Sequence, residues 1–213
     1  MTRKSILLAC AAAALAVPAI AQVALPVAAK PGSALPGAPV AARVTAGNYK
    51  VDTNHTQVVW TLNHMGFTPL SGVFHASGGS LTLDPAKPAA AKVTVNFTIA
   101  DTMTSLPAFT KHLLSPDLLD SAKFGTASFT STKVAVNGTA AKITGNLTLM
   151  GVTKPVTLDA KFYGAGDNAR SKKLNIGFSA KTTIKRSDFG IMYGPTVGDE
   201  VELEIYAAFE KLA

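Results

Sequence analysis

A chain of 213 residues with 47% hydrophobic residues and a single cysteine is long enough to bury a core that is stable without disulfide bonds. Its formal net charge of +7 is mild, and its lysines and arginines are scattered rather than gathered with aromatic residues, which argues against a nucleic-acid-binding protein. The densest basic group, Arg170, Lys172 and Lys173, is typical of a solvated loop and is also compatible with contact to anionic lipid.

The N-terminus has the layout of a cleaved secretory signal. Arg3 and Lys4 precede an apolar run over residues 6–17, and an A-x-A cleavage pattern follows that ends at Ala21. The apolar run is shorter than the ~20 residues that a helix needs to cross a bilayer, which argues against a membrane anchor. We therefore predict a signal peptide over residues 1–21 and a mature protein that is exported from the cytoplasm.

The cysteine, Cys10, lies inside this predicted signal, so that the mature chain contains none. A lipoprotein box at Cys10 is disfavoured because Ile6 alone would remain of the apolar run before it. Residues 22–47 follow and are rich in Ala, Pro and Val without apolar periodicity, which is typical of a semi-extended linker. We expect the folded domain to occupy residues 48–213.

Apolar and polar residues alternate in several stretches of this domain, as they do in strands that bury one face. Turn signals separate the stretches: Asn137-Gly138 predicts a two-residue hairpin turn, and Met150-Gly151 and residues 164–167 predict further turns. We count about eight strands, which predicts an antiparallel sandwich or barrel. The inward positions of the clearest stretches are Val58, Trp60 and Leu62; Val93, Val95, Phe97 and Ile99; Ile143, Gly145, Leu147 and Leu149; Ile176, Phe178, Ala180, Thr182 and Ile184; and Val201, Leu203, Ile205, Ala207 and Phe209.

The alternation alone does not decide between a sandwich and a barrel. A sandwich fills its interior, whereas a barrel of about eight strands can hold one small ligand. The inward stripes mix small residues, such as Gly145, Ala180 and Ala207, with Phe178 and Phe209. This mixture suits either a cavity or tight packing.

Residues 106–120 break the alternation and predict a helical excursion. Phe109 and Leu113 stand at helical spacing, and Ser115 followed by Pro116 predicts the N-cap and first turn of a second short helix. In a barrel, such a segment commonly lies over one mouth.

Motifs of the common enzymes and metal sites are missing from the sequence. There is no G-x-S-x-G, no phosphate-binding loop and no G-x-G-x-x-G. None of the four histidines stands at a short metal-ligand spacing from another, and no acidic cluster is near them. We therefore expect no resident cofactor, no metal and no catalytic activity. The histidines are His55, His64, His75 and His112.

Two polar residues share the parity of an inward stripe. His64 follows the stripe of β-type residues that ends at Leu62, and a structural role is favoured for it. Arg186 follows the stripe that ends at Ile184, where a buried charge is costly unless it is paired. Arg186 therefore either pairs with an internal carboxylate such as Asp188, leaves the barrel at the strand end, or contacts the polar head of a ligand. These alternatives stay open at this point.

Five segments of the chain occur in a recognisable order: residues 49–56 (YKVDTNHT), 64–66 (HMG), 111–117 (KHLLSPD), 145–156 (GNLTLMGVTKPV) and 186–190 (RSDFG). With these segments the chain resembles the YceI-like family of periplasmic proteins, and the resemblance extends from residue 49 to about residue 211. It implies a lipocalin-like eight-stranded antiparallel β-barrel with a long apolar cavity, often in a dimer, that binds a polyisoprenoid or another amphiphile such as a prenylated quinone.

We therefore predict a periplasmic binding or carrier protein for a long-chain apolar lipid, with transient contact to a membrane or membrane protein. An enzyme in which His64, His112 and Arg186 converge on a lipid-like substrate is one alternative, and a structural protein whose barrel is filled by its own side chains is another. The residues that we expect to contact the ligand are Trp60, His64, Phe97, Phe109, His112, Phe178, Ala180, Arg186 and Phe209.

Overall fold

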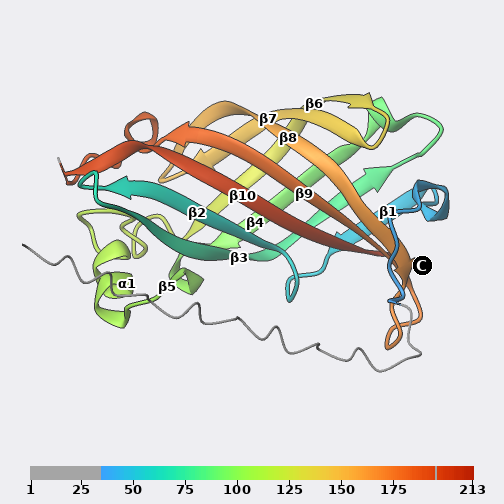
Figure 1. Cartoon of the computed structure of the whole chain (residues 1–213), viewed down its shortest axis with the longest axis horizontal. Helices are drawn as coiled ribbons and strands as arrows, with labels where there is room; N and C mark the ends of the chain where they lie inside the picture. The colour runs from blue at the N-terminus through green and yellow to red at the C-terminus, as the bar shows by residue number, and fades with distance from the viewer. Residues whose placement is uncertain (1–34, 195) are drawn as a thin grey trace, which may run out of the picture. The chain divides into compact units, whose positions relative to one another are not determined.

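The computed structural model describes residues 35–194 and 196–213. In this part of the chain eight strands form a closed antiparallel barrel, and the last of them, β10, pairs with both β9 and β2 (Figure 1). The predicted antiparallel barrel is thus confirmed, and the sandwich alternative is wrong. In barrel order the strands are β2 (Gln57–His64), β3 (Thr68–Leu83), β4 (Lys92–Thr98), β6 (Thr126–Asn137), β7 (Ala140–Leu149), β8 (Val152–Asp167), β9 (Leu174–Lys185) and β10 (Val197–Lys211).

Two short strands complete the wall. β1 (Gly47–Val51) lies between β10 and β3 beyond the point where β2 begins, so that Tyr49 faces Lys211 on one side and Leu81 on the other. β5 (Met103–Thr104) pairs with β3 in the half of the barrel that β2 covers. β1 and β2 therefore share one position in the wall, one in each half.

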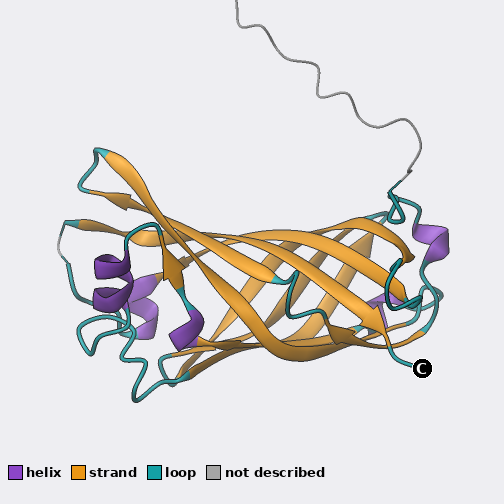
Figure 2. Cartoon of the chain, turned by 90° about the horizontal axis from the view of Figure 1, so that it is seen from below, coloured by secondary structure: helices purple, strands orange, loops and turns teal. Residues whose placement is uncertain are grey.

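The two ends of the barrel carry different elements. Helix α1 (Pro107–Leu113) lies at one end together with β5, and we call this the α1 end (Figures 1 and 2). The C-terminus lies at the opposite end, which we call the far end (Figure 1). The 3₁₀ turns are η1 (Ala41–Arg43), η2 (Pro88–Ala90), η3 (Ile99–Asp101) and η4 (Arg186–Phe189).

Buried apolar side chains inside the barrel form two clusters rather than one. The cluster in the half of the barrel at the far end includes Tyr49 and Phe209, and the cluster near α1 includes Trp60 and Ile99. Phe97 on β4 packs against both clusters. The predicted inward stripes supply six of the fourteen buried residues in these clusters, because alternate side chains of each strand point to the same face.

The excursion over residues 106–120 contains one helix, not the two that the sequence predicts. α1 begins with Pro107 in its first turn, where the missing amide hydrogen costs nothing. Ser115 does not cap a second helix, because its hydroxyl donates to the carbonyl of His112 at 2.7 Å and so helps to end α1. The amide of Asp120 then donates back to the carbonyl of Ser115 at 2.8 Å, which turns the chain.

Two hairpin turns are confirmed, one of them with a shift. Met150 and Gly151 form the turn between β7 and β8 with φ angles of 49° and 73°, the left-handed values that two-residue hairpins need. Between β6 and β7, Asn137 pairs with Ala140, so that the turn starts at Gly138, one residue later than expected.

The turn predicted over residues 164–167 is wrong, because β8 continues as a strand to Asp167. The glycines there make room for another backbone. Ala38 forms a bridge with Ala165, and a Cβ atom on Gly166 would lie 1.9 Å from the carbonyl oxygen of Pro36. Composition alone does not distinguish such a crossing from a turn.

The described part of the predicted linker, residues 35–47, lies against the barrel and is not a free spacer. Arg43 donates to the carbonyl of Ala165 on β8 at 3.4 Å, and Val44 packs against the cluster at the far end. The chain is thereby attached to the barrel before β1 begins.

The signal peptide predicted over residues 1–21 and the linker residues 22–34 lie outside the described residues. Among the residues that the structure does describe, no helix has both the length and the apolar character to cross a membrane.

Candidate functional site: two apolar cavities

A cavity of about 330 Å³ lies inside the barrel at the α1 end, and we call it cavity 1. Inward side chains of the strands form its wall, and Phe109, His112 and Leu113 of α1 also line it. The mouth loop, which we define as residues 191–194 with 196 and 197, contributes Ile191 and Tyr193. Six of the predicted ligand contacts meet in this cavity: Trp60, His64, Phe97, Phe109, His112 and Arg186.

A second cavity of about 290 Å³, cavity 2, occupies the half of the barrel toward the far end and shares no lining residue with cavity 1. Ala41 of η1 and the β6–β7 hairpin complete its lining. The remaining predicted contacts, Phe178, Ala180 and Phe209, line this second cavity. The structure thus divides the predicted set between two chambers instead of one tunnel.

Two phenylalanine side chains from adjacent strands stand at the boundary between the cavities. Phe97 on β4 lines cavity 1, and Phe129 on β6 lines cavity 2. The ring of Phe129 lies over Gly145 of β7, where a Cβ atom would be only 2.4 Å from the ring. The absence of a side chain at Gly145 therefore leaves room for the ring of Phe129 on the neighbouring strand. This packing explains why a glycine stands in the inward stripe of β7.

Trp60 shapes the wall of cavity 1 in a similar way. Its indole lies over Gly72 of β3, where a Cβ atom would be 2.5 Å from the ring. Its Nε1 atom is buried and has no acceptor within the described part of the chain, an arrangement that costs about 1–3 kcal/mol. Because this atom is covered, Trp60 offers cavity 1 an apolar surface and no hydrogen bond.

The hydrogen-bond partners of Arg186 are not among those that the sequence-based alternatives name. Its guanidinium donates to backbone carbonyls only, and none of the ion pairs found within residues 35–194 and 196–213 includes it. With five bonds, each N–H group of the planar guanidinium has an acceptor. The acceptors are Gly198 (3.0 Å, from Nε), Ile191 and Tyr193 (2.7 and 2.9 Å, from Nη1), and Gly194 and Val197 (3.1 and 3.2 Å, from Nη2).

Among the described residues, Arg186 thus pairs with no internal carboxylate, and its contact with a ligand stays a prediction. The side chain lines cavity 1, but its donors are turned to the backbone of the mouth loop and of β10. Arg186 therefore holds the mouth loop in place, and its N–H groups already have acceptors.

A second polar contact fastens the same region. Asp199 of β10 accepts hydrogen bonds from the hydroxyl and the amide of Ser187 in η4, at 2.7 and 3.0 Å. These bonds lower the pKa of Asp199 below its usual value, and the charge of Arg186 acts in the same direction. η4 is thus joined to β10 by side chains at both Arg186 and Ser187.

Further polar side chains line cavity 1, among them two histidines and Tyr193 and Thr196 of the mouth loop. His112 of α1 meets Tyr193 of the mouth loop edge to face, with 5.1 Å between ring centroids, so that the helix and the loop touch across the mouth. His64 ends β2 at the same mouth. Neither imidazole has a hydrogen-bond partner within the described residues.

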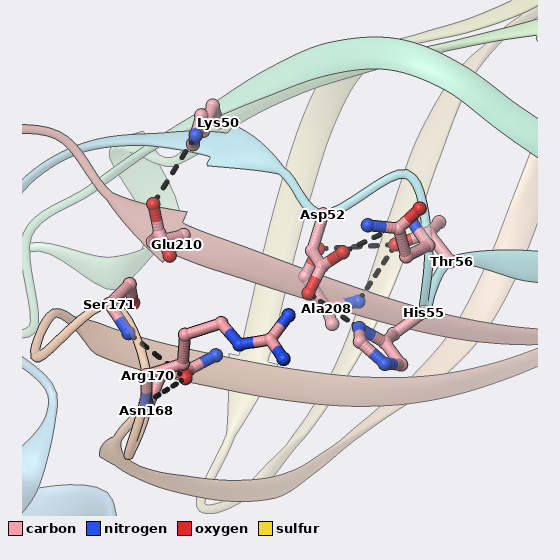
Figure 3. A network of polar contacts seen from close by, with 10 residues as sticks. Lys50, Asp52, His55, Thr56, Asn168, Arg170, Ser171, Ala208 and Glu210 are labelled. Carbon is pink, nitrogen blue, oxygen red and sulfur yellow. Dashed lines mark hydrogen bonds and ion pairs between the residues drawn. The ribbon is translucent and has the colours of Figure 1, made fainter.

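Figure 3 shows a network of polar contacts, and none of the residues labelled there lines either cavity. The Nδ1 atom of His55 lies 2.7 Å from a carboxylate oxygen of Asp52, and Lys50 pairs with Glu210 at 3.3 Å. A hydrogen bond from Ser171, followed by the contact with Lys50, lowers the pKa of Glu210. The network joins β1 and the β8–β9 loop to β10, which is a structural role.

Within the described residues, no three side chains of His, Cys, Asp or Glu come together in a group that could hold a metal ion.

Several lining residues escaped the sequence-based prediction. Ala41 and Val44 belong to the segment interpreted as linker, and Ile191 and Tyr193 belong to a loop without periodicity. Phe129 could have been found, because it alternates with polar neighbours on β6. The others depend on how distant segments meet, which a local pattern does not show.

Comparison with known proteins identifies the domain. A family model described as the YceI-like domain matches residues 49–209. The Protein YceI of Escherichia coli O157:H7 is 42% identical to this chain over 169 residues, which cover 78% of this chain and 87% of the relative.

Solved structures agree with this fold. The crystal structure of the Campylobacter jejuni YCEI protein superposes with a TM-score of 0.62 at 30% identity, covering 71% of this chain and 90% of that chain. A polyisoprenoid binding domain from Saccharophagus degradans, implicated in plant cell wall breakdown, superposes with a TM-score of 0.55 at 13% identity, covering 77% and 98%. At that identity the second likeness shows the fold alone.

Proposed function

The chain belongs to the YceI-like domain family, and from this premise we propose that its barrel binds a long-chain apolar lipid, such as a polyisoprenoid or a prenylated quinone. We further propose that the exported protein carries or sequesters this lipid in the periplasm. The single observation that carries the proposal is an interior with two chambers whose linings are almost entirely apolar.

The lining favours an apolar chain over a charged molecule. Each methylene that leaves water contributes ~0.8 kcal/mol, so that a prenyl chain can bind without many polar contacts. The charged side chains among the lining residues are Arg186 in cavity 1 and Lys161 in cavity 2, and the donors of Arg186 are already used. A buried anionic head would thus lack a free cation in cavity 1.

The two alternative functions have less support. A barrel filled by its own side chains would leave no chambers of about 330 and 290 Å³. An enzyme would need His64, His112 and Arg186 to act together, and Arg186 is committed to holding backbone carbonyls. Binding rather than catalysis is the function that the geometry supports.

The description of the Saccharophagus degradans protein as a polyisoprenoid binding domain gives this proposal its ligand class. A prenyl chain has regular methyl branches and no charge, which suits a wall of Leu, Ile, Val and Phe side chains. The cavities do not specify the head group of the lipid, because several polar side chains line cavity 1, namely His64, His112, Tyr193 and Thr196.

Native mass spectrometry of the exported protein, combined with organic extraction, tests the proposal. We expect the mature chain to begin at Gln22 and to carry a lipid adduct that extraction removes, with prenyl fragments in the extract. Protein with an intact fold that carries no lipid, and that binds none of a panel of prenyl lipids, would contradict the lipid-binding proposal. A mature terminus at a lipid-modified Cys10 would contradict the predicted cleavage.

A further inference from the structure

Three stretches that the fold brings to the α1 end of the barrel lack Asp, Glu, Lys, Arg and His. They are residues 65–74, 102–110 and 189–198. Each is bounded by titratable residues, for example by Asp101 and Lys111 around the second stretch. The first forms the β2–β3 turn and the start of β3, the second leads into α1, and the third forms the mouth loop.

These stretches expose large apolar side chains to an unusual degree. Six of the twelve exposed large apolar side chains in the described part of the chain belong to them, with exposed fractions from 49% for Met65 to 83% for Phe67. Singly exposed apolar residues are ordinary, but a concentration of them marks a contact surface. We call the six the rim residues: Met65, Phe67, Met103, Leu106, Met192 and Tyr193.

Direct contacts hold the three stretches around the mouth of cavity 1. The amide of Met65 donates to the carbonyl of Thr196 in the mouth loop at 2.8 Å. The ring of Tyr193 in the same loop meets His112 of α1. Met103 lies on β5, which pairs with β3 and leads into α1 (Figures 1 and 2).

The rim is continuous with the interior of the barrel. Tyr193 is 53% exposed and also lines cavity 1, as do Phe109 and Leu70 from the other two stretches. An apolar molecule can therefore pass from the rim into cavity 1 along side chains that carry no charge. Charged residues lie outside these stretches at both ends, for example Lys111 on α1 and Arg170 and Lys172 at the far end.

We propose that the rim residues insert into the surface of a lipid bilayer and that the lipid enters cavity 1 there. This inference rests on the proposed lipid-binding function. Because the rim stretches hold no charged groups, they match the uncharged acyl region and give contact that does not depend on anionic lipid or on salt. A lipid bilayer is also the phase in which a long apolar ligand is dissolved, so that the ligand need not cross water.

Flotation of the mature protein with vesicles tests this proposal. We expect similar binding to vesicles of phosphatidylcholine alone and of phosphatidylcholine with phosphatidylglycerol, with little effect of salt. The double variant Phe67→Ser with Met192→Ser should bind at least about tenfold more weakly, because each fully buried side chain of this size is worth about that factor. Both side chains are largely exposed, so that the fold should not depend on them.

Two matched variants serve as controls. Tyr163→Ser with Leu212→Ser removes two exposed apolar side chains outside the rim and should leave vesicle binding unchanged. Arg170→Gln with Lys172→Gln removes two charges at the far end and should also leave it unchanged. Melting temperatures of all variants, measured without vesicles, show that each is folded.

Three outcomes would overturn the proposal. The rim variant binds vesicles as the parent does; or binding requires phosphatidylglycerol and is lost in Arg170→Gln with Lys172→Gln; or light scattering shows a dimer that only the rim variant dissociates, which would assign the rim to a second copy. The lipid content of the parent is measured separately. A parent that binds vesicles through the rim but never contains lipid would contradict the proposed function instead.

Discussion

At the residue scale, Arg186 shows how one side chain can shape the mouth of a cavity through hydrogen bonds to the backbone. Its five hydrogen bonds join η4 to the mouth loop and the first residues of β10. The guanidinium suits this task because its donors lie in one plane in fixed directions.

Arg186→Met should destabilise the empty protein by about 1.5–3 kcal/mol, because it leaves several carbonyls without their charged donor. Parity on the strand alone would suggest the opposite, an empty protein of unchanged stability. Thermal unfolding without lipid measures the effect. Arg186→Lys keeps the charge but offers three donors at one point, and should recover only part of the loss. An unchanged melting temperature in Arg186→Met would show that the mouth loop holds without it.

For single residues, the sequence predicts which side chains point into the barrel better than it predicts their hydrogen-bond partners. Trp60, Phe97 and Phe178 were placed inside by alternation, and they lie inside. The partners of Arg186 could not be predicted, because they are backbone carbonyls of a loop without periodicity. Whether the nine expected contacts touch a lipid stays a prediction.

At the element scale, the connection from η4 to β10 is the segment that decides the shape of the mouth. Arg186 holds its carbonyls, and Asp199 accepts two hydrogen bonds from Ser187. The lowered pKa of Asp199 means that this carboxylate stabilises the folded protein at any pH above its ordinary value of 3.8. That stabilisation is lost as the pH falls below this value toward the lower pKa of the folded state.

We therefore expect Asp199→Asn to reduce the melting temperature at neutral pH, and the difference from the parent to shrink as the pH falls below 3.8. Other carboxylates also respond to acid, so that the difference between the two proteins is the informative quantity. Melting temperatures across a pH series measure it. Parallel curves for parent and variant at every pH would show that the contact with Ser187 carries no pH dependence.

Elements are predictable where local chemistry decides them. The turn at Met150-Gly151 follows from residues that adopt left-handed φ angles, and the structure confirms it. The glycines at 164 and 166 lie in β8 because residues 36–38 cross them, which no local pattern shows. The predicted second helix at Ser115 is wrong for a related reason. A serine hydroxyl can cap a helix that follows it or bond to the last turn of a helix that precedes it, and Ser115 does the second.

At the scale of the whole molecule, the closed barrel contains two chambers, and the sequence does not reveal that its apolar interior is split in this way. The stripes predict an apolar interior, and the family resemblance predicts a long cavity. Phe97 lines cavity 1 and Phe129 lines cavity 2, and Ala41 of η1 and Val44 help to line cavity 2 from a segment interpreted as linker.

The two chambers predict a dependence of binding on chain length that two tryptophan variants can reveal. Ala180 lines cavity 2 and Ala127 lines cavity 1, and both side chains are buried. We expect Ala180→Trp to weaken binding of the long prenyl alcohol solanesol by roughly tenfold, which is about 1.4 kcal/mol, while the short prenyl alcohol farnesol binds nearly as before. Ala127→Trp should weaken the binding of both, because it fills the chamber next to the mouth.

Fluorescence titration with both alcohols measures these affinities, and thermal unfolding measures the stability of the empty variants. A cavity absorbs the added indole, whereas overpacking of a filled core costs roughly 1–3 kcal/mol. If Ala180→Trp and Ala127→Trp are as stable as the parent and differ in their effect on solanesol and farnesol, one long chain uses both chambers. Equal loss of both alcohols in Ala180→Trp would mean that cavity 2 is the entry, and unfolding of both variants would mean that the interior has no room for a lipid.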